Sequence, residues 1–171
     1  FLSPGEQGAL WDPRLHGAIT GLTLRHGREH LARGLVNGII LESRRCLGVL
    51  AEIGALGQVI EVAGGSAADP SFRADLADAS RRRVSMPGDD DTGYSARGAA
   101  LLAASAIDGR RPPVTGSASL VVDSTVGDST VGDSTVVAEP DPARAKLWDE
   151  LWARYELARR AVAGFDHGIT R

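Results

Sequence analysis

Apolar residues recur at steps of three and four along several stretches of the chain, which is the spacing that places them on one face of an α-helix. Over residues 28–54 this pattern predicts the longest helix before the C-terminus. Its apolar face is expected to consist of Leu31, Leu35, Ile39, Cys46, Leu50 and Ile53. Gly34 and Gly38 interrupt the same helix. Because glycine costs a helix about 1 kcal/mol relative to alanine, we expect them to mark close packing against another element.

Two further helices are expected in the second half of the chain. Residues 92–107 are rich in alanine and are followed by Gly109, which suits a helix C-cap, and their small side chains would let another backbone lie close. Asp141 and Pro142 then predict the start of a helix that runs to about Val162. Its apolar face is expected to contain Leu147, Leu151, Tyr155, Ala158 and Val162, with Trp148 and Trp152 packing in the core beside it.

The rest of the chain is organised around a short strand that a glycine turn joins to a helix. The run Val59, Ile60 and Val62 is β-branched and stops at Gly64-Gly65, as a buried strand does at its end. Asp69 and Pro70 supply a capped helix start. The helix that follows should bury the face made by Phe72, Leu76 and Ala79, and a second short strand is expected over residues 84–86.

The glycine turn itself has two explanations. Two residues without a Cβ let the backbone approach a flat or anionic ligand, and the helix start nearby adds the positive end of a dipole. The opening would suit a nucleotide. A tight turn that binds nothing explains Gly64 and Gly65 as well, and it is the commoner case.

Composition narrows the range of partners. The chain has 19 basic and 22 acidic residues and a net charge of −3, so it offers no basic field for nucleic acid or an anionic membrane. The 171 residues, 43% of them hydrophobic, suit one domain with a core. The single cysteine, Cys46, cannot form an internal disulfide, and a cytoplasmic location is expected. No apolar run is long enough to span a bilayer, and the first residues do not have the pattern of a signal peptide.

Two motifs raise the question of a metal. His26, Glu29 and His30 have the H-x-x-E-H spacing of inverted zinc peptidases, for which Glu61 or Glu139 would have to be the third ligand. No helical pattern precedes His26, so the two rings would not share a face, and a helix start is favoured over zinc. Three acids at positions 89–91 suggest magnesium, but adjacent acids in a loop usually face solvent. No metal site is predicted on these residues.

Two other stretches are given ordinary structural explanations. The arginines at positions 81–83 lie where a helix should end, and we interpret them as a cap. Further on, three copies of Asp-Ser-Thr-Val begin at Asp123, Asp128 and Asp133. A period of five fits neither a strand nor a helix. Residues 112–138 are therefore predicted to be a low-complexity insertion, a flexible loop with some extended character.

The strand, turn and helix resemble the adenosine motif of the FGGY carbohydrate kinases, which belong to the actin-like ATPase superfamily. In that family the strand ends in three small residues, matched by Gly64, Gly65 and Ser66, and an Ala-Asp pair closes the helix, matched by Ala77-Asp78. Residues 95–100, Ser-Ala-Arg-Gly-Ala-Ala, are similar to a family motif on a helix beside the nucleotide. Further matches precede these, at Leu2, Ser3, Gly5, Glu6, Trp11-Asp12-Pro13, Gly17 and Gly21-Leu22-Thr23. The chain departs from the family at Gln7, Phe72 and Ala74.

The resemblance implies an α/β fold, part of an actin-like ATPase (ribonuclease H-like) domain with long flanking helices, in which residues 1–171 are a C-terminal FGGY kinase domain. It implies the nucleotide-binding portion of an ATP-dependent kinase that phosphorylates a sugar hydroxyl. D-xylulose is the leading substrate and gluconate the next, with ATP and Mg²⁺ as cofactors. Gly64, Gly65 and Ser66 would lie against the adenosine. Asp69 either contacts the nucleotide or only caps its helix.

The same resemblance assigns no catalytic residue to this chain. In the family, the aspartate base, the phosphate-binding Gly-Thr loops and the acids that hold magnesium all precede the matched region, so the chain alone is expected to be inactive. It does not begin with Met, which suggests a fragment, and the sugar would bind through the missing N-terminal domain. A non-catalytic actin-fold remnant that acts as a binding module remains the alternative. A homodimer is compatible with the sequence.

Overall fold

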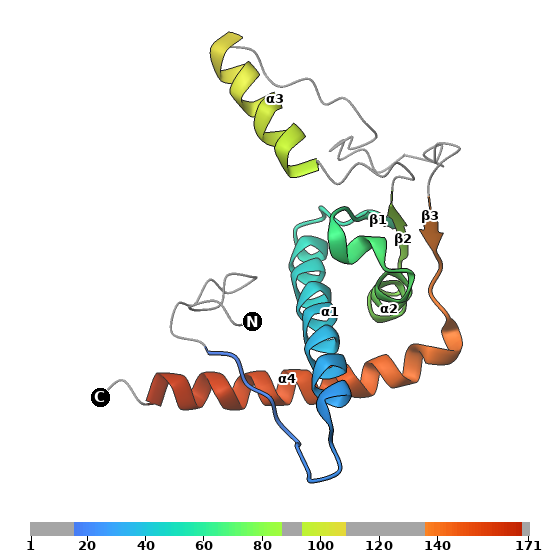
Figure 1. The fold of residues 1–171 in the computed structure, drawn as a ribbon, viewed down its shortest axis with the longest axis vertical. Helices are drawn as coiled ribbons and strands as arrows, with labels where there is room; N and C mark the ends of the chain where they lie inside the picture. The colour runs from blue at the N-terminus through green and yellow to red at the C-terminus, as the bar shows by residue number, and fades with distance from the viewer. Residues whose placement is uncertain (1–15, 87–93, 109–135, 169–171) are drawn as a thin grey trace.

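The computed structural model describes residues 16–86, 94–108 and 136–168. The elements in chain order are α1 (Arg28–Glu52), β1 (Val59–Glu61), the 3₁₀ turn η1 (Gly65–Ala68), α2 (Pro70–Ser80), β2 (Arg83–Met86), α3 (Tyr94–Asp108), β3 (Val136–Ala138), the 3₁₀ turn η2 (Pro142–Arg144) and α4 (Ala145–Gly168). Figure 1 shows α1, α2 and the sheet grouped together, with the long α4 crossing α1 and α3 lying apart. The predicted helices and the two predicted strands are therefore present.

The three strands form one small mixed sheet in the order β1-β2-β3. β1 is parallel to β2, with Val59 opposite Arg83, and β3 is antiparallel to β2, with Val84 opposite Ala138. β3 lies at the end of the stretch predicted to be a flexible insertion. Residues 136–138 pair with Val84, Ser85 and Met86 of β2, so the extended character expected of that stretch is present at its end. The remaining repeats and the acids at 89–91 lie outside the described residues.

The core is built where α1, α2, β2 and α4 meet. Trp148 in α4 is only 1% exposed, as its predicted core role requires, and α2 buries the face predicted for it. Leu147, the neighbour of Trp148 and predicted for the apolar face of α4, is 48% exposed, so the prediction is wrong at that position. The buried apolar cluster consists of Ile40, Leu41, Leu76, Ala77, Ala79, Val84 and Trp148.

The predicted apolar face of α1 is also wrong. The helix buries Ile40 and Leu41 against α2 and α4, whereas Leu35 is 48% and Ile53 71% exposed. Ile39 and Leu50, on the same predicted face, are exposed too. Both sides of α1 carry apolar residues, so periodicity alone cannot decide which side packs. Gly34 and Gly38 do not show the expected close packing, since among the described residues no heavy atom lies within 4 Å of the place a Cβ would take.

Two buried carboxylates fix α2 to the start of α4. Arg144 places one guanidinium nitrogen 2.7 Å from an Asp75 oxygen and another 2.7 Å from an Asp78 oxygen. Asp78 also accepts a hydrogen bond from the backbone N–H of Asp141, at 2.7 Å. Arg33 of α1 adds a second ion pair to Asp75, at 2.7 Å. Two segments of the chain, α1 and residues 141–144, therefore converge on two acids of α2.

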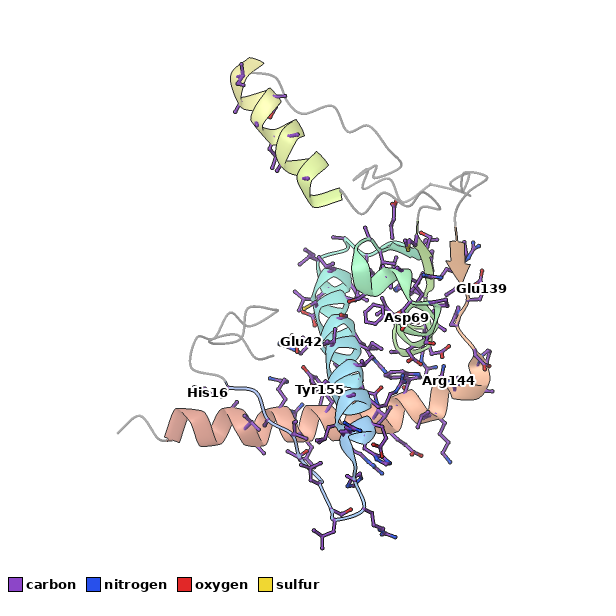
Figure 2. All side chains as sticks on the ribbon, in the orientation of Figure 1. His16, Glu42, Asp69, Glu139, Arg144 and Tyr155 are labelled. Atoms are coloured by element: carbon purple, nitrogen blue, oxygen red, sulfur yellow. The ribbon has the colours of Figure 1, made fainter. Side chains whose placement is uncertain are left out.

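A second polar cluster joins α1 to α4. Glu42 is buried in α1, and its carboxylate pairs with Arg45 and accepts a hydrogen bond from the Tyr155 hydroxyl of α4. Figure 2 labels Glu42 and Tyr155 on the two crossing helices. Burial, and then the Glu42 carboxylate, raise the pKa of the Tyr155 hydroxyl. The cluster keeps a charge inside the fold by pairing it.

The three arginines after α2 do more than cap it. Arg81, in the left-handed conformation with φ 58°, ends the helix and places its guanidinium 2.5 Å from Asp149 in α4. Arg82 donates to the carbonyl of Gly57 at 2.6 Å, and Arg83 pairs with Glu139 at 2.7 Å. The cap interpretation is therefore incomplete, because each side chain ties the end of α2 to a different segment.

The histidine motif lies at the start of α1. His26 precedes the helix, as predicted, so the two rings do not share a helix face, although they meet edge to face with centroids 5.3 Å apart. Nδ1 of His26 accepts the N–H of Thr23 at 2.9 Å, and Nδ1 of His30 accepts the N–H of Gly27 at 3.1 Å. Both rings therefore hold the turn that begins the helix.

Candidate functional site

The glycine turn begins where β1 ends. The N–H of Val62 donates to the carbonyl of Ser85 at 2.9 Å, so pairing with β2 continues one residue beyond the strand. Gly64 then has φ 96° and ψ 177°, a backbone conformation that is strained for any residue with a Cβ. Its carbonyl accepts the N–H of Ala67 at 3.0 Å, which closes the turn η1. The fold itself therefore requires glycine at position 64.

Gly65 is not required in the same way. Its φ lies outside the left-handed region, and a Cβ built on it would meet no heavy atom of the described residues within 4 Å. The same open space lies beside Gly64. Since neither the backbone nor packing demands glycine at position 65, the missing side chain leaves a bare, exposed stretch of backbone. A planar ligand could lie against this stretch at van der Waals distance.

The charge at the start of α2 affects which kind of ligand the glycine turn can bind. Asp69 is exposed and its Oδ1 accepts the N–H of Ser71 at 2.8 Å, with Pro70 at the first helical position. Asp69 is therefore a helix cap, one of the two roles predicted for it. Its negative charge offsets the positive end of the helix dipole, so the predicted attraction for an anion is weakened. The turn suits a flat, uncharged group better than a phosphate.

One residue that supports the turn was not predicted. Arg73 of α2 is 7% exposed, donates through Nη1 to the carbonyl of Ala67, and approaches Sδ of Met86 at 3.7 Å. It thereby holds η1 against the end of β2. The only signal in the sequence is the spacing, which places Arg73 three residues before the apolar Leu76 and next to Phe72 of the predicted apolar face.

The structure brings together Gly64, Gly65, Ser66 and Asp69, which follow one another through the turn, but it does not bring α3 to them. Figure 1 shows α3, which carries the Ser95–Ala100 motif, away from the turn. Ala96, Ala99 and Ala100 are all exposed.

Within the ranges 16–86, 94–108 and 136–168 there is no group of three or more histidine, cysteine, aspartate or glutamate side chains placed to hold a metal ion. Glu139, one proposed third ligand for zinc, is paired with Arg83 instead. Figure 2 shows Glu139 near β3. Across the same ranges, none of the helices combines the length and the apolar character needed to cross a bilayer.

A family model and the sequences of known proteins point to the same family for this chain. Residues 2–107 match the family model described as the FGGY family of carbohydrate kinases, C-terminal domain. A glycerol kinase of Halothermothrix orenii is 38% identical over 105 residues, covering 61% of this chain and 21% of that protein. An erythritol kinase of Brucella abortus is 30% identical over 159 residues, covering 93% of this chain and 28% of that protein.

Solved structures show the same likeness in three dimensions. A xylulose kinase from Rhodospirillum rubrum has a TM-score of 0.62 and 28% identity, covering 94% of this chain and 30% of that one. A gluconate kinase from Lactobacillus acidophilus has a TM-score of 0.63 and 22% identity over the same shares. These structures support the predicted α/β class with the actin-like ATPase fold. The chain spans between 21% and 30% of the length of these four proteins.

Proposed function

The chain belongs to the FGGY family of carbohydrate kinases, and we propose that it is the nucleotide-binding portion of an ATP-dependent kinase that phosphorylates a sugar hydroxyl. The observation that carries the nucleotide role is Gly65, where neither the backbone nor any described neighbour requires glycine. Family membership gives this bare backbone its proposed ligand, the adenosine of ATP. The proposed contacts are made by Gly64, Gly65 and Ser66.

The charge at the turn supports adenosine rather than the phosphates as the group bound here. Asp69 caps α2 with one carboxylate oxygen. A second oxygen remains on the same carboxylate, and ribose hydroxyls are donors that a carboxylate can accept. The proposal therefore gives Asp69 both a capping role and a ribose contact. Phosphates and Mg²⁺ would be held by the part of the kinase fold that precedes the matched region.

Phosphoryl transfer depends on positioning and on stabilising negative charge. A chain that supplies only the nucleoside side of the site lacks the groups that do this, so we propose that it is inactive on its own. In the assembled kinase it would fix the purine, and thereby the direction in which the γ-phosphate points toward the sugar. The non-catalytic binding module would share the nucleoside contact but would not support turnover in any assembly.

D-xylulose is the proposed sugar, with gluconate second. The likeness to the xylulose kinase of Rhodospirillum rubrum, which covers nearly the whole chain, favours D-xylulose. The likeness to the gluconate kinase of Lactobacillus acidophilus is the reason that gluconate is proposed second. Glycerol and erythritol, named in the two relatives at higher sequence identity, belong in the same assay. All four are polyhydroxy compounds phosphorylated on a hydroxyl, so the class of reaction is the same for each.

Nucleotide binding tests the first part of the proposal. The chain should bind adenosine, AMP and a non-hydrolysable ATP analogue with affinities within a few-fold of one another, measured by calorimetry. Gly65→Val should abolish binding while the chain stays folded, because the space around position 65 is open. The matched control is Gly48→Ala, which should bind normally. Gly48 is an exposed position of α1 at which an added Cβ also meets no described neighbour. Equal binding by Gly65→Val would contradict the proposal.

Turnover tests the second part. A chimera joins the polypeptide that precedes the matched region in the Rhodospirillum rubrum enzyme to this chain. It should phosphorylate D-xylulose with ATP, and the Gly65→Val chimera should show a raised KM for ATP. A chimera that binds the ATP analogue but transfers no phosphate to any of the four candidate substrates would support the binding-module alternative.

A further inference from the structure

One cation of α2 is buried without an opposite charge beside it. Arg73 is 7% exposed, and its partners are the carbonyl of Ala67, to which Nη1 donates, and Sδ of Met86 at 3.7 Å. In the described part of the chain, the ion pairs of α2 are made by its acids Asp75 and Asp78 and not by Arg73. Moving a charge out of water is unfavourable unless other groups compensate for the lost hydration. The buried guanidinium therefore needs an explanation.

The stability of the fold does not require a cation at position 73. Arg73 lies one turn before Leu76 and Ala77, which belong to the core, and the thioether of Met86 lies beside its guanidinium. An unbranched apolar side chain would suit these surroundings and would have no charge to desolvate. Apolar replacements of buried charged groups are often neutral or stabilising. The guanidinium is therefore explained better by the group that it binds than by packing.

That group is a carbonyl of the glycine turn. Ala67 is 2% exposed, its N–H donates to the carbonyl of Gly64 at 3.0 Å, and its own carbonyl accepts from Arg73. A hydrogen bond from a charged donor is roughly twice as strong as one between neutral groups. Both backbone groups of Ala67 are thereby fixed, one to the start of the turn and the other to α2.

This anchor restricts the exposed backbone that precedes it. On the side of β1, Val62 is held by its hydrogen bond to the carbonyl of Ser85 at 2.9 Å, so residues 64–66 lie between two fixed points. Glycine loses more backbone freedom than any other residue when it is ordered. A segment that is already held in its bound conformation does not lose that freedom again when a ligand binds.

We propose that Arg73 is a positioning residue for the nucleotide. Through the carbonyl of Ala67 it holds the backbone of residues 64–66 in the conformation that contacts adenosine. Arg73 acts on the backbone and not on the ligand, since its side chain is buried. It therefore controls nucleotide affinity more than it controls the stability of the fold. The inference rests on the nucleotide contact proposed above.

Arg73→Met tests the proposal, because methionine keeps an unbranched side chain and removes every donor. The variant should bind the non-hydrolysable ATP analogue about ten-fold more weakly in calorimetry, while its Tm changes by less than about 4 °C. Without nucleotide, the amides of Ala67 and Asp69, which close the turn, should exchange with deuterium faster than in the wild type. The amides of residues 76–80 in α2 should keep their wild-type rates. Arg73→Lys, which restores a charged donor, should recover part of the affinity and part of the slow exchange.

Arg82→Met is the matched control. Arg82 also donates to a backbone carbonyl, that of Gly57 at 2.6 Å, but Gly57 precedes β1 whereas the glycine turn follows it. The loss of this hydrogen bond should leave the affinity for the ATP analogue at its wild-type value.

Two results would overturn the proposal. Binding by Arg73→Met as tight as that of the wild type would show that the anchor does not affect the nucleotide. Weaker binding accompanied by equally faster exchange in α2 and in the turn, with no recovery in Arg73→Lys, would assign Arg73 to the fold as a whole. Failure of the nucleotide contact itself would differ from both, because the wild-type chain would then bind no nucleotide, and the claim on affinity would fall with it.

Discussion

The hydroxyl of Tyr155 donates a hydrogen bond to the buried carboxylate of Glu42, and the two residues are 113 positions apart in the sequence. Glu42 belongs to α1 and Tyr155 to α4, so this contact fixes one long helix across the other. Arg45, from the next turn of α1, neutralises the same carboxylate. If one helix slid along the other, the buried Glu42 carboxylate would lose its hydrogen bond from Tyr155 and keep only the Arg45 pair within α1.

Tyr155→Phe should therefore lower the free energy of unfolding by about 1–3 kcal/mol, because it removes one partner of a buried carboxylate and leaves the ring in place. Glu42→Gln should cost more, roughly 3–5 kcal/mol, because it removes the buried charge that pairs with Arg45 as well as the charged acceptor of the Tyr155 hydrogen bond. Urea denaturation followed by circular dichroism measures both. If Tyr155→Phe cost as much as Glu42→Gln, the ion pair would not be the stronger part of the cluster.

Replacing Asp78 of α2 should lower the free energy of unfolding more than replacing the cap residue Asp69. It is 3% exposed, pairs with Arg144 and accepts the N–H of Asp141, so Asp78→Ala should cost roughly 3–5 kcal/mol. Asp69→Ala, at the N-cap of the same helix, removes an exposed cap and should cost about 1 kcal/mol. Chemical denaturation of the two variants side by side checks the order, and the reverse order would mean that the link between α2 and η2 contributes little.

Trp148 and Leu147 are adjacent in α4 but lie in opposite environments. Trp148→Ala should lower the free energy of unfolding by roughly 3–5 kcal/mol, since it opens a cavity in the core. Leu147→Ala should change it by less than about 1 kcal/mol, because that side chain is half exposed. Thermal unfolding of both variants is the measurement. Similar costs at the two positions would indicate that α4 is rotated relative to this structure.

Acid should weaken the contact between α2 and α4. The hydrogen bond from Arg81, with the charges of Arg81 and Arg44, holds the pKa of Asp149 below its ordinary value. A carboxylate with a lowered folded pKa stabilises the fold fully above its unfolded pKa of about 4, and this contribution is lost as the pH falls through the lower folded value. The difference in unfolding free energy between the wild type and Asp149→Asn should therefore be largest near neutral pH and vanish in acid. A difference that stayed constant from about pH 7 to about pH 3 would contradict the ion pair.

Local chemistry made the ends of the elements predictable. Asp69 before Pro70 and Asp141 before Pro142 each marked a helical start, and both aspartates accept a hydrogen bond from an N–H two residues on. These rules depend only on neighbouring residues, so no knowledge of the rest of the fold is needed. The short strand before Gly64 was predictable for the same reason.

Tertiary contacts determine which side of α1 is buried and which residue supports the glycine turn, and neither could be predicted from the sequence. Ile40 and Ile39 are adjacent and identical in type, yet only Ile40 is buried, because the choice depends on which side α2 and α4 approach. Likewise Arg73 supports the candidate turn through the carbonyl of Ala67, a contact that exists only once η1 and α2 have folded together. Where one chain offers two apolar sides, periodicity identifies both and the rest of the protein selects one.

The bare backbone after β1 is proposed to contact adenosine. Titration of the ¹⁵N-labelled chain with a non-hydrolysable ATP analogue examines this contact residue by residue, because each backbone amide reports separately. We expect the largest shift changes at the amides of Gly64, Gly65, Ser66 and Asp69, with adenosine alone reproducing them. Saturation of the chain with no change at these four amides, or changes confined to α4, would contradict the claim.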